Sequence, residues 1–337
     1  MNIDQFKRVF DDILLIELED HLNNLDLSDE AVTWFVENFT WNVPGGKMFR
    51  GMTVVECVSR LMPKDNEHLL EKAAILGWLL ETLQAFFLVV DDIMDKGEMR
   101  RGQVAWYRRE GVGNIAINDA LLLESYIYRM LKVHFGSHPH YSKLLDLFHE
   151  VSYYTECGQL MDSIHSQTIE SFDKARYEKI TKMKTAYYSF YLPIASGIVL
   201  CEKHTASGHV LNALKEICVK LGHLFQVQDD FLDCYGMDTG KGGFSDICSG
   251  KCTWLIVTAL EKANDEQLAI LNENYGVPVV NNRERIIAVY NELGIKDMCI
   301  EWQNDIIEEI EAAIAEFVDV DNSILTWILN KIRSRQK

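Results

Sequence analysis

Apolar residues recur at intervals of three and four along most of the chain, which is the spacing of one face of an α-helix. Leu69, Ala73 and Leu76 show this period. In the segment that begins at Asn118 and Asp119, one of these two residues is expected to cap the helix. The same pattern predicts helices over 118–135, 209–233, 253–275, 282–294 and 300–318. Strand-like runs are short, so we predict an all-α bundle of ten or more helices with almost no sheet.

One apolar stretch, from Ala73 to Val90, is long enough to cross a membrane. Glu81 and Gln84 lie inside it, however, and two aspartates end it, which is unfavourable in lipid. We therefore predict a buried helix of a large bundle, with no stable membrane insertion. The N-terminus is acidic and lacks the basic region of a signal peptide, so a cytoplasmic protein is expected.

The composition favours one domain over residues 1–337. The chain is 48% hydrophobic, has five prolines and shows no linker-like segment. Its eight cysteines are scattered without a CxxC motif, which favours reduced thiols. A net charge of −18 argues against a nucleic-acid partner, and an anionic ligand would need imported positive charge such as metal ions.

Two DDxxD motifs follow apolar helices, each with a glutamine a few residues earlier. The first and last aspartates of such a motif share one helix face, and the middle one points about 100° away. Like charges at this spacing destabilise a helix, and Mg²⁺ removes that repulsion because it prefers carboxylate oxygens. One such motif arises easily by chance in an acidic chain, but two at the ends of apolar helices do not. We therefore expect two facing helix ends that hold Mg²⁺ and, through it, a diphosphate, with candidate ligands Asp91, Asp92, Asp95, Asp229, Asp230 and Asp233.

Basic residues that would meet the remaining diphosphate oxygens lie in several turns and helices. Arg100 and Arg101 follow the first motif directly. Taken alone, each basic segment also fits an ordinary solvated loop, and the basic C-terminal segment fits a solvated tail. The further candidates are Lys47 and Arg50 in a glycine-hinged turn, Lys184 and Thr185 on a helix, and Lys241 and Lys251 in the loop after the second motif.

These segments in this order resemble the short-chain trans-isoprenyl diphosphate synthases, in particular farnesyl diphosphate synthases of the eukaryotic, fungal type. The resemblance runs over nearly the whole chain. It rests on the segments NVPGGKMFRG, LQAFFLVVDDIMD, RRGQ, INDALLLES, ECGQLMD, KTAYYSFYLPIA, FQVQDDFLD and KCTWL.

The resemblance implies an all-α fold around a central cavity, a homodimer, and a prenyltransferase that condenses isopentenyl diphosphate with dimethylallyl or geranyl diphosphate. Three Mg²⁺ are expected, with Mn²⁺ as a substitute, and Asp162 is implied as a further ligand. The isopentenyl diphosphate site implied by the family is Lys47, Arg50, Gln84 and Arg101. The implied allylic diphosphate site is Arg100, Lys184, Thr185, Gln226, Lys241 and Lys251.

Product length should depend on Phe86 and Phe87, which lie about one helical turn before Asp91. Two bulky rings at this point imply a product of fifteen carbons or fewer. Core packing alone would also explain either ring.

The chain departs from the family in the loop GKGGFSDICSGK after Asp233. Three alternatives therefore stay open: a geranyl diphosphate synthase of secondary metabolism, a derived terpene cyclase and a non-catalytic partner subunit. The complete isopentenyl diphosphate set argues against a cyclase, and the two complete DDxxD motifs argue against a non-catalytic subunit.

Overall fold

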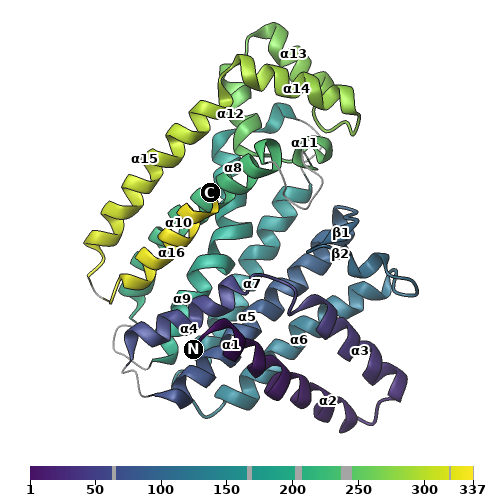
Figure 1. Cartoon of the computed structure of the whole chain (residues 1–337), viewed down its shortest axis with the longest axis vertical. Helices are drawn as coiled ribbons and strands as arrows, with labels where there is room; N and C mark the ends of the chain where they lie inside the picture. The colour runs from purple at the N-terminus through teal and green to yellow at the C-terminus, as the bar shows by residue number, and fades with distance from the viewer. Residues whose placement is uncertain (63–65, 165–168, 202–206, 237–244, 319, 337) are drawn as a thin grey trace. The chain divides into compact units, whose positions relative to one another are not determined.

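The computed structural model describes residues 1–337 except 63–65, 165–168, 202–206, 237–244, 319 and 337. In the part described, the chain is helical almost throughout (Figure 1). Its strands are Met99–Arg100 (β1) and Gln103–Val104 (β2), which pair antiparallel. The predicted all-α class with almost no sheet is confirmed.

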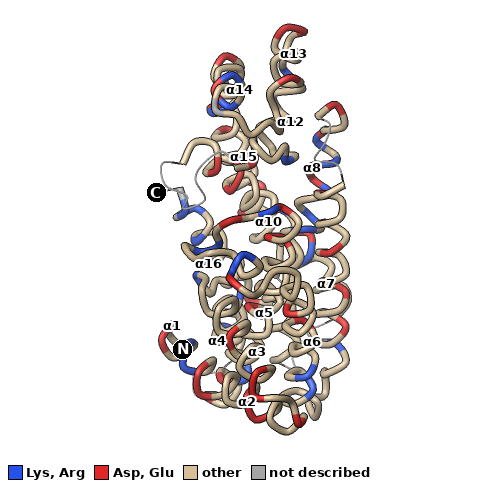
Figure 2. Tube along the Cα trace, turned by 90° about the vertical axis from the view of Figure 1, so that its right-hand side faces the viewer, with Lys and Arg blue, Asp and Glu red and all other residues tan. Residues whose placement is uncertain are grey.

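The chain separates into two compact units, each built from several chain segments. The first unit comprises Met1–Glu150, Leu192–Leu211 and Asp319–Ile324, and the second comprises Val151–Tyr191, Asn212–Val318 and Leu325–Lys337. The organisation as a single domain over 1–337 stays a prediction. Acidic residues are spread over many helices of the chain, with basic residues between them (Figure 2).

The first unit is organised around helix α5, Glu67–Met94, which packs against α4, α6 and α9. Gly51 on α4 and Gly77 on α5 let these two helices approach closely, since a Cβ added to Gly77 would lie 2.6 Å from the Gly51 carbonyl oxygen. The other elements are α1 (Ile3–Val9), η1 (Phe10–Leu15), α2 (Ile16–Asn23), α3 (Asp29–Asn42), α4 (Phe49–Leu61), η2 (Trp106–Arg108), α6 (Ile115–Phe135) and α9 (Leu192–Leu200).

Helix α5 is long and apolar enough to cross a membrane by composition alone, with a mean hydropathy of 1.9 over its most apolar window. Within the protein, however, 78% of that window is buried. Trp78 illustrates why, because its ring stacks on Phe6 at 4.6 Å and its indole N–H donates to the Phe6 carbonyl at 2.8 Å. The prediction of a buried bundle helix is confirmed.

The second unit has its own apolar core, in which Val227, Leu271 and Tyr290 are fully buried. Its elements include the later part of α7 (Tyr141–Ser163) and most of α10 (Gly208–Tyr235). The others are η3 (Ile169–Ser171), α8 (Lys174–Thr181), η4 (Lys182–Tyr191), α11 (Ser245–Ser249), α12 (Trp254–Lys262), α13 (Asp265–Asn274), α14 (Val280–Glu292), α15 (Ile295–Glu316), most of α16 (Ser323–Arg333), and η5 (Ser334–Gln336).

Three predicted helices differ from the structure, and one of them, 300–318, begins earlier, at Ile295. The segment 253–275 is two helices, because Asn264 caps α13 by accepting the Gln267 N–H while the Gln267 side chain accepts the Asn264 N–H. The segment 118–135 begins earlier, at Ile115. Asp119 is therefore not a cap but a buried residue inside α6, with 1% of its surface exposed.

Candidate active site

The first aspartate-rich motif forms the C-terminal end of α5. Asp92 points inward and is 4% exposed, whereas Asp91 is half-buried and Asp95, the C-cap residue, is exposed. This is the arrangement that the helical spacing predicts, with the first and last carboxylates on one face and the middle one turned away.

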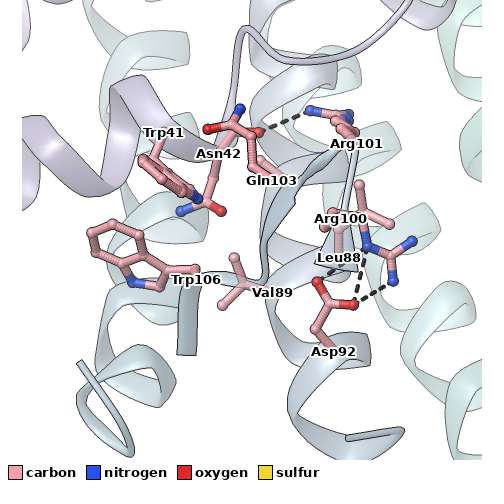
Figure 3. Close-up of a pocket in the computed structure, with 10 residues that line it drawn as sticks. Trp41, Asn42, Leu88, Val89, Asp92, Arg100, Arg101, Gln103 and Trp106 are labelled. Atoms are coloured by element: carbon pink, nitrogen blue, oxygen red, sulfur yellow. Dashed lines mark hydrogen bonds and ion pairs between the residues drawn. The ribbon is translucent and has the colours of Figure 1, made fainter. Parts of the chain in front are cut away.

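Arg100, on β1, binds two of these carboxylates, of which Asp92 is drawn in Figure 3. Its Nη2 donates to Asp92 Oδ1 at 2.5 Å and to Asp91 Oδ2 at 3.1 Å, and its Nε donates to both Asp92 oxygens. Burial raises the pKa of Asp92, Arg100 opposes this, and the like charges of Asp91 and Asp95 add to it. Arg100 thus binds the first two aspartates of the motif with one guanidinium.

Arg101 is fixed by an unusual backbone and by the glycine turn before α4. Its φ is +54°, and its Nη1 donates to the Asn42 carbonyl oxygen at 3.0 Å (Figure 3). A Cβ at Gly46 would lie 2.8 Å from Arg101 Nη2, so a side chain at this position would displace the end of the Arg101 side chain. The structure therefore brings Arg101 and the GGK turn together.

The other isopentenyl diphosphate candidates lie close by in sequence or on α5. Lys47 is exposed in the turn, Arg50 is half-buried in the first turn of α4, and Gln84 is half-buried on α5. The proposed length determinants also lie on α5, with Phe86 buried, Phe87 half-buried and their ring centroids 5.1 Å apart.

Glu81 supports the start of α4, a role that our sequence reasoning missed. It is 1% exposed and its Oε1 accepts the Gly51 N–H at 2.8 Å. Burial raises its pKa, while the Gly51 N–H and the charges of Arg50 and Arg101 oppose the rise. Its sequence signal was a lone glutamate inside a long apolar stretch, which we used only to argue against a membrane span.

A small cavity of about 20 Å³ lies beside these residues (Figure 3). This is room for about one water molecule. The cavity combines guanidinium groups with indole and aliphatic walls, and its lining is Trp41, Asn42, Ala85, Leu88, Val89, Asp92, Arg100, Arg101, Gln103 and Trp106.

In the second unit, Asp162 brings together two of the predicted allylic diphosphate residues. Lys184 Nζ and Lys251 Nζ both donate to Asp162 Oδ2, at 2.6 and 3.1 Å. Burial by itself would raise the pKa of Asp162, but the two ammonium groups hold it below its ordinary value. The site thus contains two cations that share one buried carboxylate.

Lys184 and Thr185 lie in a π-helical segment, Lys182–Tyr191. Gly158 on α7 allows the close approach of this segment, since a Cβ there would lie 2.3 Å from the Lys184 nitrogen. Thr185 Oγ1 donates to Gln226 Oε1 at 2.9 Å, which ties the segment to α10. Single π-helical turns are frequent at functional sites, and this one fixes two candidate residues.

The second motif lies at the end of α10, with the middle aspartate again buried. Asp230 accepts the Tyr177 hydroxyl at 2.9 Å, the Trp254 N–H at 2.8 Å and the Gln226 amide at 3.0 Å. Burial raises its pKa to about 7, although all three donors oppose the rise. Its oxygens therefore join α8, α10 and α12.

The outer aspartates of this motif also have partners. Asp229 Oδ1 accepts from Arg335 Nη2 at 3.2 Å, and the Arg335 guanidinium lies 3.9 Å from the centroid of the Phe225 ring. Asp233 accepts the Ser245 hydroxyl and the Asp246 N–H, at 2.7 and 3.0 Å. The described residues Ser245 and Asp246 are thus bound to the last aspartate of the motif.

Among the residues that the structure describes, no three acidic, histidine or cysteine side chains converge as a preformed metal cage. This is compatible with Mg²⁺, which usually takes one or two carboxylates and completes its shell with water and substrate phosphates. The carboxylates of Asp91, which is half-buried, and Asp95, which is exposed, fit such a donor set.

Lys241, the remaining allylic diphosphate candidate, lies outside the described residues.

Comparison with known proteins identifies this arrangement. The family model for polyprenyl synthetase matches residues 32–293. The chain is 41% identical to the farnesyl pyrophosphate synthase of Kluyveromyces lactis, over 99% of this chain and 98% of that protein. It is 40% identical to that of Saccharomyces cerevisiae, over 96% and 95%. A Trypanosoma brucei farnesyl diphosphate synthase complexed with bisphosphonate matches the fold with a TM-score of 0.92 and 30% identity, over 100% of both chains.

An all-α fold that carries two aspartate-rich helix ends, with basic residues bound to the aspartates, defines a prenyltransferase. The chain belongs to the polyprenyl synthetase family.

Proposed function

We propose that this chain is a farnesyl diphosphate synthase, which condenses isopentenyl diphosphate with dimethylallyl or geranyl diphosphate in a head-to-tail, trans reaction. The observation that carries the proposal is the identity of about 40% over nearly the full length of fungal farnesyl pyrophosphate synthases. Both DDxxD motifs are complete within this match.

Isopentenyl diphosphate is proposed to bind at Lys47, Arg50, Gln84 and Arg101. Support comes from the contact of Arg101 with the glycine turn and from Glu81, which holds the first turn of α4 beneath Arg50. A guanidinium suits this ligand because its fork of N–H donors matches phosphate oxygens.

The allylic diphosphate is proposed to bind at Arg100, Lys184, Thr185, Gln226, Lys241 and Lys251. Support comes from the pairing of Arg100 with Asp91 of the first motif and of Lys184 and Lys251 with Asp162, a proposed metal ligand. Magnesium, when bound at the outer aspartates and Asp162, supplies the positive charge that stabilises a diphosphate leaving group.

The residues of this chain would act mainly by binding and orienting charge. The guanidinium of Arg100 and the ammonium groups of Lys184 and Lys241 are proposed to stabilise the negative charge that develops as the allylic C–O bond breaks. The alkene of isopentenyl diphosphate then attacks the allylic cation. The proton lost afterwards can pass to the departing diphosphate, so the reaction requires no histidine or glutamate base.

Product length is proposed to depend on the Phe86–Phe87 pair, which restricts space on α5 before Asp91. Its close ring contact supports a short product because two bulky side chains occupy consecutive positions. Replacing Phe86 with alanine is expected to shift products beyond fifteen carbons.

We also propose a homodimer in a reducing, cytoplasmic compartment. Ile117 and Leu121 lie one turn apart on α6 and are 53% and 52% exposed, as is typical of a surface that another chain covers. All eight cysteines are free, which suits a reducing compartment. Light scattering after size exclusion tests the dimer, and Leu121→Glu should shift the population towards monomer.

The deciding experiment incubates the protein with Mg²⁺, labelled isopentenyl diphosphate and either dimethylallyl or geranyl diphosphate, and sizes the products by chromatography. A fifteen-carbon product is expected. A ten-carbon product alone would identify a geranyl diphosphate synthase. A hydrocarbon formed without isopentenyl diphosphate would identify a cyclase, and no turnover would identify a non-catalytic partner subunit.

A further inference from the structure

Arg101 is connected to the protein interior through the end of helix α3. The carbonyl oxygen that accepts its Nη1 belongs to Asn42, the last residue of α3. Carbonyls in the last turn of a helix have no partner within the helix, so they are natural acceptors for a cation. The Asn42 side chain turns back and donates to the backbone and side-chain oxygens of Asn38, at 2.9 and 2.8 Å.

Asn38 passes this connection to α6. It is fully buried, and its Nδ2 donates to the backbone carbonyl of Asp119 at 3.0 Å. A continuous series of hydrogen bonds therefore runs from Arg101 through Asn42 and Asn38 to Asp119.

The carboxylate of Asp119 holds two further segments. Its Oδ1 accepts the Trp34 indole N–H from α3 at 2.9 Å, and its Oδ2 accepts the Trp106 indole N–H from η2 at 2.8 Å. One buried side chain thus joins α3, η2 and α6, which pack against one another.

Trp106 connects Asp119 to the cavity beside Arg101, because its ring forms part of the cavity wall (Figure 3). The Arg109 guanidinium lies 4.8 Å from the Trp106 ring centroid and 4.2 Å from that of Trp41. The aromatic wall next to Arg101 is therefore held from both sides, by a cation and by the Asp119 carboxylate.

A buried carboxylate bound by neutral N–H groups contributes little net stability, since well-packed apolar residues usually stabilise the fold as much or more. Such a residue instead fixes the orientation of its partners, because two indoles and one amide all donate to Asp119. Asp119 is 1% exposed, and no substrate diphosphate can reach it directly. Any effect on the substrate must act through the groups that it holds.

We infer that Asp119 is a positioning residue for isopentenyl diphosphate: it fixes the C-terminal end of α3 and the Trp106 wall, and through them Arg101. The inference rests on the proposed function, in which Arg101 binds that substrate. Arg100 is held separately by Asp91 and Asp92, so the allylic substrate should be far less affected.

The test measures steady-state constants for both substrates, together with direct binding of isopentenyl diphosphate by calorimetry, for Asp119→Asn and Asn38→Leu. The KM and Kd for isopentenyl diphosphate should rise by about 10-fold to 100-fold, since displacing a binding group by about 1 Å has effects of this size. The KM for the allylic substrate and kcat should stay within about twofold. Asp119→Asn removes an acceptor from the two indoles, whereas Asn38→Leu breaks the separate hydrogen bond to the Asp119 backbone carbonyl and serves if Asp119→Asn does not fold.

Tyr126→Phe is the matched control. It removes a buried hydrogen bond from the same helix, Tyr126 Oη to the Leu14 carbonyl at 2.9 Å, without touching the Asp119 series. It should leave both KM values unchanged.

A double-mutant cycle with Arg101→Ala separates a positioning role from a general one. If Asp119 acts through Arg101, the double variant should bind isopentenyl diphosphate no more weakly than Arg101→Ala alone. Additive losses, or equal losses for the two substrates, would overturn the inference and leave the proposed function intact. A wild-type chain that neither binds isopentenyl diphosphate nor forms product would overturn the proposed function itself.

Discussion

The two aspartate-rich helix ends share a pattern but neutralise their charge differently. In both, the middle aspartate is buried, with Asp92 4% and Asp230 3% exposed. Asp92 is paired with the guanidinium of Arg100, whereas Asp230 is bound by a hydroxyl, an amide and a backbone N–H. Only the first motif therefore compensates its inner charge with a cation.

The two inner aspartates therefore have different roles, although the DDxxD pattern is the same. At the end of α5 the inner aspartate fixes a basic residue that is proposed to meet substrate. At the end of α10 it fastens neighbouring helices to one another, because its donors come from α8, α10 and α12. The outer aspartates are the proposed metal ligands in both.

The largest effect should follow from the outer position of the first motif. Asp91→Ala should lower turnover by about 10³-fold or more, because a bound metal contributes several kcal/mol of transition-state stabilisation. The helical fold should persist, since Asp91 is half-buried on a helix end. Circular dichroism checks the fold, and activity within a few-fold of wild type would contradict the first metal site.

Exchanging each inner aspartate for asparagine tests the comparison itself. Asp230→Asn should lower the free energy of unfolding by about 2–3 kcal/mol, since one carboxamide oxygen cannot serve three buried donors. Asp92→Asn should lower it by about 1 kcal/mol, because Arg100 retains Asp91 and its side chain is 26% exposed. Urea unfolding without metal measures both, and the reverse order would break the proposed division of tasks.

Glu81 is a second buried carboxylate that, like Asp230, accepts a backbone N–H, so it tests how a buried acid without a directly paired cation contributes to stability. Its raised pKa means that its stabilising effect is fully present below its ordinary pKa and is lost as pH rises through the raised one. The free energy of unfolding of wild type relative to Glu81→Gln should therefore be largest in acid and shrink as pH rises. A difference that grows with pH would show that cations dominate at Glu81 as well.

The smallest effect concerns Arg335, which pairs with the outer Asp229 at 3.2 Å. This partly exposed pair should contribute less than about 1 kcal/mol to stability. Arg335→Ala should nevertheless strengthen Mn²⁺ binding a few-fold, measured by electron paramagnetic resonance, since a competing cation is removed. Arg333→Ala, which breaks a pair with Glu311 instead, is the control and should leave Mn²⁺ affinity unchanged.

The sequence carried the fold class and the outline of the site because periodicity and charged motifs are local signals. It could not assign the inner aspartates, since the partners of Asp92 and Asp230 depend on contacts between segments distant in the chain. Asp119 shows the same limit, because an aspartate after an asparagine looks like a helix cap until the preceding residues prove helical. The π-helical geometry of Lys182–Tyr191 likewise has no local signature in the sequence.

The contact between Gly51 and Gly77 limits how this chain can vary. Any side chain at either position would push α4 off α5 and carry the turn before α4 away from Arg101. A change at one glycine cannot be compensated by a smaller residue at the other, since none exists. Neither position touches a substrate, yet no other residue should be tolerated at either. A library of functional variants should therefore return glycine at both.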